Sequence, residues 1–213
     1  MKPVLYGLGF SLYVRKVRFI LEFKGIDYDF DSVPPSQAED YLKISPLGKI
    51  PAMTFDDFNI SDSSVIALYL EKKYPQEAIL PENPEDYAKA LWYDEYSDTR
   101  MTEIISGIFF EKFGRPRFFG DPPNEERIAE LETRFPEIFD YLEGQLEGKT
   151  YLVGSSLSLA DFSVISNLYN HKMCGYEIDS DRWPNTAAYQ SFILNEPSVK
   201  AVIEQEVSEG ELD

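Results

Sequence analysis

Cysteine is nearly absent from this sequence of 213 residues, which contains only Cys174. A single cysteine excludes an internal disulfide framework and fits a reducing compartment. No apolar run approaches the ~18 residues that a membrane span needs, and the first residues, MKPVLYG, lack a signal-peptide pattern. We therefore expect a soluble, cytoplasmic protein with no membrane partner.

Basic residues are also scarce, because 20 Lys and Arg stand against 38 Asp and Glu, giving a formal net charge of −18. Such a surface repels phosphate backbones, so we expect no nucleic-acid partner. The excess acid is consistent with a role in solubility. An anionic small ligand would need local positive charge. The best local source is the segment 15–18, RKVR, with Lys49 further on.

Histidine occurs once, as His171, so a Ser-His-Asp hydrolase would have to use that residue. His171 lies on a predicted core helix, 158–173, and an ordinary role within that helix is favoured. Cys174 stands near the end of the same helix, where packing is favoured over a role as nucleophile.

Apolar residues are plentiful, at 43% hydrophobic and 15% aromatic, which is typical of a globular chain. Up to about residue 77 the pattern predicts the order β-α-β-α-β-β-α. The corresponding segments are 3–9, 14–23, 26–33, 37–44, 51–57, 58–61 and 61–75. The alternating aspartates of 26–33 lack the glycine and closing glutamate of a calcium loop. We expect no metal site.

A linker is predicted at 79–86, where ILPENPED contains two prolines and three acids. Beyond it the periodicity is helical almost throughout. The predicted helices are 85–113, 124–147, 158–173, 184–194 and 197–206, with FGRPRFFGDPPN as a loop between the first two. The acidic tail EVSEGELD is expected to be frayed. We therefore expect an N-terminal α/β domain, 1–78, and an all-helical domain, 87–213.

Two predicted helix N-termini carry side chains suited to an anion or a thiolate. Ser11 follows the glycines of GLGFS before one helix, and Asp62 and Ser63 begin another. A helix N-terminus offers unpaired N–H groups and partial positive charge. Considered alone, each of these residues is more simply interpreted as a helix cap. Ser158 and Asp161 have the spacing of a capping box, which is a folding device.

The combined pattern resembles the glutathione S-transferase family over essentially the whole chain. SPLGKIPAM resembles the segment before the family's cis-proline, and SDSSVIALYLEKKYP resembles its acid-serine motif and following helix. SLSLADFSVIS resembles the capping box of the family's long second-domain helix. The resemblance implies a thioredoxin-like domain followed by an all-helical domain, glutathione as co-substrate, no metal and a homodimer.

The resemblance also implies roles for single residues in binding glutathione. The cysteinyl unit would pair like a strand with the backbone of Ile50, which a cis bond to Pro51 would expose to the ligand. This would explain a proline at a strand start. Ser63 would bind the γ-glutamyl carboxylate, and Asp62 would lie near the ligand ammonium. Lys49 would pair with the glycyl carboxylate.

Ser11 is the expected activating hydroxyl, because it precedes Arg15 by four residues, the spacing of serine-type, theta-like members. Leu12 departs from many bacterial relatives, in which proline is frequent at this position. Tyr6 and Tyr13 are alternatives, since tyrosine-type members exist. In the implied reaction, glutathione thiolate attacks an electrophilic, hydrophobic small molecule, and the hydroxyl stabilises the thiolate.

The predicted helix 85–113 is rich in aromatic residues that could form core, a co-substrate pocket or a dimer seam. These are Trp92, Tyr93, Tyr96, Phe109 and Phe110. Phe10, Tyr13 and Tyr96 are the expected co-substrate residues. A glutathione-dependent isomerase, dehalogenase, peroxidase or ether-cleaving lyase is an alternative function. So is a non-catalytic binding module, because fold alone does not establish function.

Overall fold

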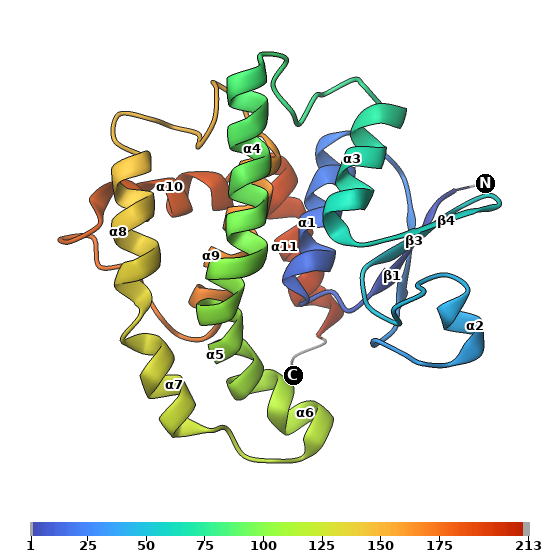
Figure 1. The fold of residues 1–213 in the computed structure, drawn as a ribbon, viewed down its shortest axis with the longest axis horizontal. Helices are drawn as coiled ribbons and strands as arrows, with labels where there is room; N and C mark the ends of the chain where they lie inside the picture. The colour runs from blue at the N-terminus through green and yellow to red at the C-terminus, as the bar shows by residue number, and fades with distance from the viewer. Residues whose placement is uncertain (1, 211–213) are drawn as a thin grey trace. The chain divides into compact units, whose positions relative to one another are not determined.

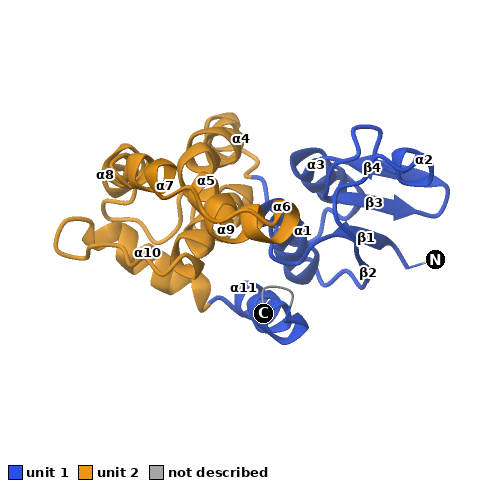
Figure 2. Ribbon diagram, turned by 90° about the horizontal axis from the view of Figure 1, so that it is seen from below, with its two compact units in different colours: residues 1–80, 196–213 blue, residues 81–195 orange. Residues whose placement is uncertain are grey.

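The computed structural model describes residues 2–210 and divides the chain into two compact units (Figure 2). Unit 1 is Met1–Leu80 with Glu196–Asp213, and unit 2 is Pro81–Asn195. The expected domains, 1–78 and 87–213, differ from this division because the C-terminal segment belongs to unit 1. The expected linker 79–86 also contains the start of helix α4, Pro84–Tyr96.

Within the described residues, unit 1 holds a four-stranded mixed sheet in the order β2-β1-β3-β4. Helices α1 and α3 lie together on one face of this sheet and α2 lies on the other (Figure 1). The elements are β1 (Val4–Gly7), α1 (Leu12–Phe23), β2 (Asp29–Ser32), α2 (Glu39–Leu42), β3 (Ala52–Phe55), β4 (Phe58–Ser61), α3 (Ser63–Lys73) and α11 (Pro197–Glu209). The predicted β-α-β-α-β-β-α order and thioredoxin-like fold are confirmed.

Helix α11 packs on α1 through one face, which is apolar in its first half and acidic in its second. Arg15 of α1 pairs with Glu206 at 2.7 Å. Three residues further along both helices, Arg18 pairs with Glu209 at 2.7 Å. The expectation of a frayed tail is therefore wrong as far as α11 extends, because these ion pairs hold it on α1. Residues 211–213 of that tail lie outside the described residues.

The basic segment 15–18 is buried, with Arg15, Lys16 and Arg18 each at most 1% exposed as whole residues. The two arginines bind α11, and Lys16 Nζ donates to the hydroxyl of Ser64 at 3.2 Å. The expectation that this segment supplies positive charge to a ligand is wrong. Buried cations need partners inside the protein, and these three have them.

Unit 2 is helical, as predicted, and is organised around the almost entirely buried helix α9. Helices α4, α5, α10 and the π-helical segment η1 all pack against α9. The elements are α4 (Pro84–Tyr96), η1 (Ser97–Ser106), α5 (Gly107–Phe109), η2 (Phe110–Gly114), α6 (Arg115–Phe119), α7 (Glu125–Glu132), α8 (Phe135–Gln145), α9 (Leu159–Met173) and α10 (Pro184–Leu194).

The predicted helix 85–113 changes from α- to π-helical geometry along its length. Side chains bind a backbone carbonyl where the π-helical stretch begins. The Ser97 carbonyl accepts hydrogen bonds from Thr102 Oγ1 at 2.8 Å and from Asn167 Nδ2 at 3.1 Å. These side-chain donors satisfy the carbonyl within the buried contact between η1 and α9.

Two other boundaries in unit 2 differ from the prediction. The predicted loop 113–124 contains helix α6, whose second residue is Pro116 and whose end is marked by Gly120 at φ 71°. Proline in a first turn and glycine after the last turn are compatible with a short helix. The predicted helix 124–147 is interrupted before Phe135, and Pro136 then occupies the first turn of α8.

The aromatic residues of the long helix divide between core and surface. Tyr93 and Phe109 are 3% and 7% exposed, so they belong to the core. Trp92 is 54% exposed and Phe110 is 41% exposed. Tyr96 packs its ring 4.8 Å from that of Tyr141. Core packing within unit 2 therefore explains some of these five aromatic residues but not the exposed Trp92 and Phe110.

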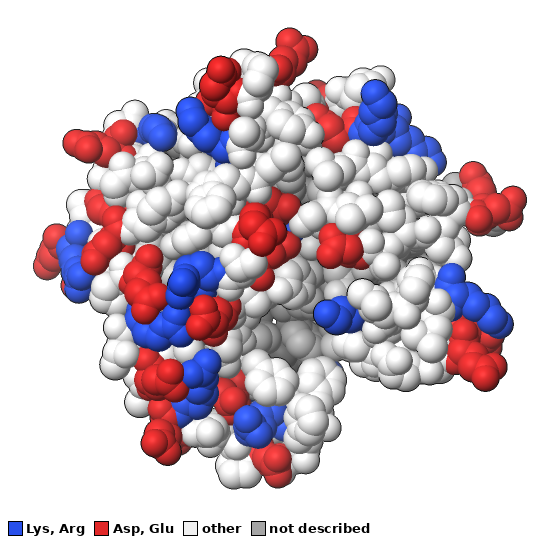
Figure 3. Space-filling view, in the orientation of Figure 1, with Lys and Arg blue, Asp and Glu red and all other residues white. Residues whose placement is uncertain are grey.

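Acidic and basic side chains are interleaved over α7 and α8 on the face drawn in Figure 3. Arg134 pairs with Glu103 at 2.7 Å and with Glu137 at 2.9 Å. Exposed pairs of this kind contribute little to stability individually. No helix within residues 2–210 combines the length and apolar character that crossing a membrane requires.

The predicted capping box at the start of α9 is confirmed. The buried Asp161 carboxylate accepts hydrogen bonds from the Ser158 N–H at 3.0 Å and the Ser158 hydroxyl at 2.9 Å. It also accepts from the Leu152 N–H at 3.0 Å and the Tyr189 hydroxyl at 2.9 Å. Burial raises the pKa of Asp161 to about 6. One side chain thus joins the start of α9 to α10 and to the preceding loop.

We predict that Asp161→Ala lowers the free energy of unfolding by about 3 kcal/mol or more, because it leaves several buried donors unpaired. The matched control is Asp86→Ala at the third residue of α4, where the carboxylate accepts from Asn83 Nδ2 at 2.9 Å near the surface. That change should cost much less, because water can replace the carboxylate at the surface. Urea unfolding of both variants tests this, and equal costs would contradict it.

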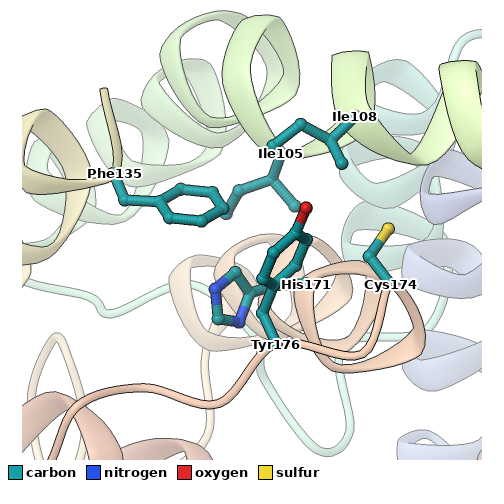
Figure 4. Close-up of a pocket in the computed structure, with 6 residues that line it drawn as sticks. All are labelled: Ile105, Ile108, Phe135, His171, Cys174 and Tyr176. Carbon is teal, nitrogen blue, oxygen red and sulfur yellow. The ribbon is translucent and has the colours of Figure 1, made fainter. Parts of the chain in front are cut away.

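His171 lies in a narrow pocket of unit 2 among apolar and aromatic side chains (Figure 4). The pocket is lined by Ile105, Ile108, Phe135, His171, Cys174 and Tyr176, and it leaves no space for the centre of a water molecule. His171 Nδ1 has no hydrogen-bond partner within residues 2–210. Burial lowers the pKa of His171 to about 4 and raises that of Cys174 to about 12. Burial thus favours the neutral form of both His171 and Cys174, as expected for side chains that pack in the core.

We predict that His171 makes the protein less stable as the pH falls from 6.5 to 4. Its pKa in the folded state is about 4, below the ordinary 6.5, so the unfolded chain binds more protons in this interval. Unfolding free energies of the wild type and His171→Phe should therefore diverge from their pH 7 difference by up to about 3 kcal/mol, with the wild type losing more. Parallel pH dependences in urea titrations would contradict this.

Candidate functional site

Three segments singled out in the sequence emerge from the same edge of the unit 1 sheet. In the strand register, Tyr6 near the end of β1 lies opposite Ala52 at the start of β3. Ala52 in turn lies opposite Ser61 at the end of β4. The loop after β1, the residues before β3 and the residues after β4 therefore begin from one row of the sheet (Figure 1).

Ser11 is the N-cap residue of α1 by position, but its side chain makes no capping hydrogen bond. The backbone N–H of Ser11 donates to the Leu8 carbonyl at 3.0 Å, which closes the turn between β1 and α1. The side chain is half-buried, and its hydroxyl makes no hydrogen bond to any residue from 2 to 210. The capping interpretation of Ser11 is thus wrong, and the hydroxyl remains able to donate to a ligand.

The peptide bond between Ile50 and Pro51 is cis. Pro51 is buried just before β3, and its carbonyl accepts from the Asp62 N–H at 3.3 Å. The N–H and the carbonyl of Ile50 make no hydrogen bond with the part of the chain that the structure describes. A half-buried backbone with both groups unpaired can accept an added strand.

The turn before Ile50 brings Lys49 to the surface. Gly48 has φ 65°, and an added Cβ would lie 2.4 Å from the Ser36 carbonyl oxygen, so only glycine fits. The Lys49 carbonyl accepts from the Ser45 hydroxyl at 2.8 Å and the Tyr41 hydroxyl at 3.1 Å. The Lys49 side chain is exposed and forms no ion pair with an acid within residues 2–210.

Asp62 and Ser63 occupy the start of α3 with different environments. Asp62 has φ 80°, a left-handed value that is uncommon for a residue other than glycine and is frequent at functional sites. Its carboxylate accepts from the N–H groups of Ser64 and Val65, both at 3.0 Å, so its capping role is confirmed. Ser63 is 3% exposed, and its hydroxyl has no partner among residues 2–210.

Ile50 and Pro51 therefore precede this row at β3, Asp62 and Ser63 follow it at β4, and Ser11 ends the loop that leaves β1. Gly7, the residue after Tyr6 in β1, lies close to Ile50, since a Cβ built on it would lie 3.4 Å from the Ile50 Cβ. Two side-chain hydroxyls and one backbone segment there lack partners within the described chain. Such groups, at helix N-termini, can recognise a small peptide that carries carboxylates.

The remaining predicted site residues have more ordinary surroundings. Phe10 is buried in the loop before Ser11, and Tyr13 is half-buried in the first turn of α1. Tyr6 lies within β1, before the loop. Tyr96 belongs to unit 2, where its hydroxyl donates to a backbone carbonyl at 3.4 Å and burial raises its pKa.

One contact beside the site was missed by the sequence analysis. Arg15 Nη2 donates to the Phe10 carbonyl at 3.0 Å while the same side chain pairs with Glu206. The available signal was the spacing of Glu206 and Glu209, which continues the buried face of α11. Because residues 206–213 are acidic, this segment was expected to be frayed and exposed to solvent.

The comparisons with known proteins cover both units. Residues 5–78 match the family described as "Glutathione S-transferase, N-terminal domain", and residues 99–197 match "Glutathione S-transferase, C-terminal domain". A glutathione S-transferase of Triticum aestivum is 29% identical over 209 residues, which are 96% of this chain and 94% of that protein.

A relative from Arabidopsis thaliana and a solved structure agree with these matches. Glutathione S-transferase Z2 of Arabidopsis thaliana is 30% identical over 201 residues, which are 90% of this chain and 86% of that protein. The crystal structure of glutathione transferase F7 from Populus trichocarpa has a TM-score of 0.84 at 25% identity and covers 96% of this chain and 99% of its own. The chain therefore belongs to the glutathione S-transferase family.

Proposed function

We propose that this protein is a glutathione transferase that binds glutathione at the edge of the unit 1 sheet and activates its thiol. The observation that carries the proposal is the grouping of Ser11, Ile50 and Ser63, whose hydroxyl or backbone groups lack partners within residues 2–210. Glutathione offers the complementary chemistry, since it is a peptide with two carboxylates, one ammonium and a thiol.

In this proposal the cysteinyl unit pairs with the N–H and carbonyl of Ile50 beside Pro51. The γ-glutamyl carboxylate binds the Ser63 hydroxyl and the N-terminus of α3, and Asp62 lies near the ammonium. Lys49, which is exposed, pairs with the glycyl carboxylate. Among similar proteins, a glutathione S-transferase-I with 26% identity and a TM-score of 0.84 was solved with lactoylglutathione.

The N-terminus of α1 and the Ser11 hydroxyl supply the proposed activation. A free cysteine thiol has a pKa of about 8.5, and thiolate is the nucleophile. A donated hydrogen bond and the helix N-terminus both stabilise the charged form, so the proton leaves to solvent at lower pH. The thiolate sulfur then forms a bond to an electrophilic carbon, and the leaving group departs with its electron pair.

The electrophile in the proposed reaction is hydrophobic. Phe10 precedes Ser11 and Tyr13 follows it by two residues, and both are proposed to contact the electrophile. We further propose that the protein acts as a cytoplasmic homodimer without nucleic-acid, membrane or metal partners, as expected from the sequence.

Isothermal titration calorimetry with glutathione tests binding, and we predict a Kd at or below about 1 mM. Ser63→Ala should weaken binding roughly 10- to 100-fold, because it removes a hydrogen bond to a charged carboxylate. Ser191→Ala, at an exposed serine of α10, is the control and should bind like the wild type. No binding by the wild type at millimolar glutathione would overturn the proposed function.

Conjugation of 1-chloro-2,4-dinitrobenzene tests activation. We predict that Ser11→Ala lowers kcat/KM roughly 10- to 100-fold, because the thiolate loses its donor, while calorimetric affinity for glutathione changes little. Tyr6→Phe and Tyr13→Phe remove the alternative hydroxyls and should retain most activity. An unchanged rate in Ser11→Ala, with a loss in either tyrosine variant, would assign the role to that tyrosine instead.

A further inference from the structure

The peptide group between Phe10 and Ser11 is held at both of its ends. Its carbonyl oxygen accepts a hydrogen bond from Arg15 Nη2 at 3.0 Å. Its N–H, which belongs to Ser11, donates to the Leu8 carbonyl at 3.0 Å. These two contacts restrict rotation of the peptide plane, and that plane determines the direction in which the Ser11 side chain leaves the backbone.

Arg15 can hold the Phe10 carbonyl only while its own guanidinium is held. Arg15 Nε donates to Glu206 Oε2 and Arg15 Nη2 donates to Glu206 Oε1, both at 2.7 Å. This two-point, charge-assisted geometry fixes the plane of the guanidinium. The Arg15 side chain is 0% exposed and that of Glu206 is 5% exposed, so water competes little with the pair.

We propose that Glu206, on the C-terminal helix α11, is a positioning residue for Ser11 and acts through Arg15 and the Phe10 carbonyl. This role rests on the proposed function, because it concerns the hydroxyl that activates glutathione. Without the Glu206 carboxylate, the buried guanidinium turns toward other acceptors, and the peptide before Ser11 loses its restraint. A misplacement of about 1 Å in a supporting contact can reduce a rate about 100-fold.

A second ion pair between the same two helices provides a matched control. Arg18 Nη2 donates to Glu209 Oε1 at 2.7 Å and Arg18 Nη1 donates to Glu209 Oε2 at 2.8 Å. Arg18 also bonds to the side chains of Gln205 and Tyr28, and none of these contacts involves the loop before Ser11. Both pairs anchor α11 on α1, but only the Arg15–Glu206 pair is joined to the site.

The experiment compares Glu206→Gln, Glu206→Asp and Glu209→Gln in the full-length chain. At saturating glutathione, the pH dependence of kcat/KM for 1-chloro-2,4-dinitrobenzene reports the pKa of the enzyme-bound glutathione thiol. In Glu206→Gln we expect this pKa to rise toward the free value of about 8.5, and kcat/KM at pH 6.5 to fall roughly 10-fold. The calorimetric Kd of glutathione, measured at pH 5.5 below the titration of the thiol, should change less than about 2-fold, because Ile50 and Ser63 are unaffected.

Glu209→Gln should leave the pH profile at its wild-type position, even if its thermal unfolding temperature falls. Glu206→Asp keeps the charge on a shorter side chain and should give an intermediate profile. If Glu206→Gln does not fold, the pH profile of Glu206→Asp tests the positioning role in its place. All variants are assayed at a temperature below every measured Tm.

A wild-type profile in the Glu206 variants would overturn the positioning role, as would an equal shift in Glu209→Gln. The latter would mean that loosening α11 is sufficient by itself. These outcomes differ from failure of the proposed function, in which the wild type would neither bind glutathione nor conjugate it. In that case the role of Glu206 falls with the function.

Discussion

The pairing of β3 with β1 on one side and with β4 on the other is the constraint on which the candidate site depends. It aligns Tyr6, Ala52 and Ser61 in one row, so that three loops distant in sequence begin at the same edge. A shift of one residue in either pairing would turn alternate side chains to the opposite face of the sheet. Ala52 and Met53 of β3 lie on opposite faces and are both fully buried, so such a shift would exchange a small and a large side chain between two packed faces.

At this edge the fold leaves polar groups unpaired, although proteins usually satisfy them. Most buried backbone and side-chain polar groups in folded proteins have hydrogen-bond partners, and exceptions require an explanation. Within residues 2–210, the half-buried Ile50 backbone and Ser11 hydroxyl lack partners, and so does the hydroxyl of Ser63. Asp62, next to Ser63, adds a backbone φ in the left-handed range. A bound peptide would explain all of these features together.

Buried charge explains why the C-terminal helix belongs to the α/β unit. Helix α1 carries Arg15 and Arg18 on a face that is removed from water, where an unpaired cation would be strongly unfavourable. Glu206 and Glu209 of α11 provide the opposite charges. The net charge of −18 therefore does not indicate the local charge at the site. Glu206 and Glu209 neutralise buried arginines, whereas Lys49 stays exposed.

The sequence by itself determined the order of strands and helices, the helical second half, the Asp62 cap and the Ser158–Asp161 capping box, because these depend on neighbours a few residues apart. The family resemblance also suggested the candidate site residues, whose roles remain proposals. Only the tertiary structure decided that Ser11 does not use its hydroxyl as a cap, that the basic segment 15–18 is buried, and that α11 completes unit 1. These outcomes depend on contacts such as Arg15 with Glu206, 191 residues apart, and no local periodicity or charge pattern specifies which distant groups will meet.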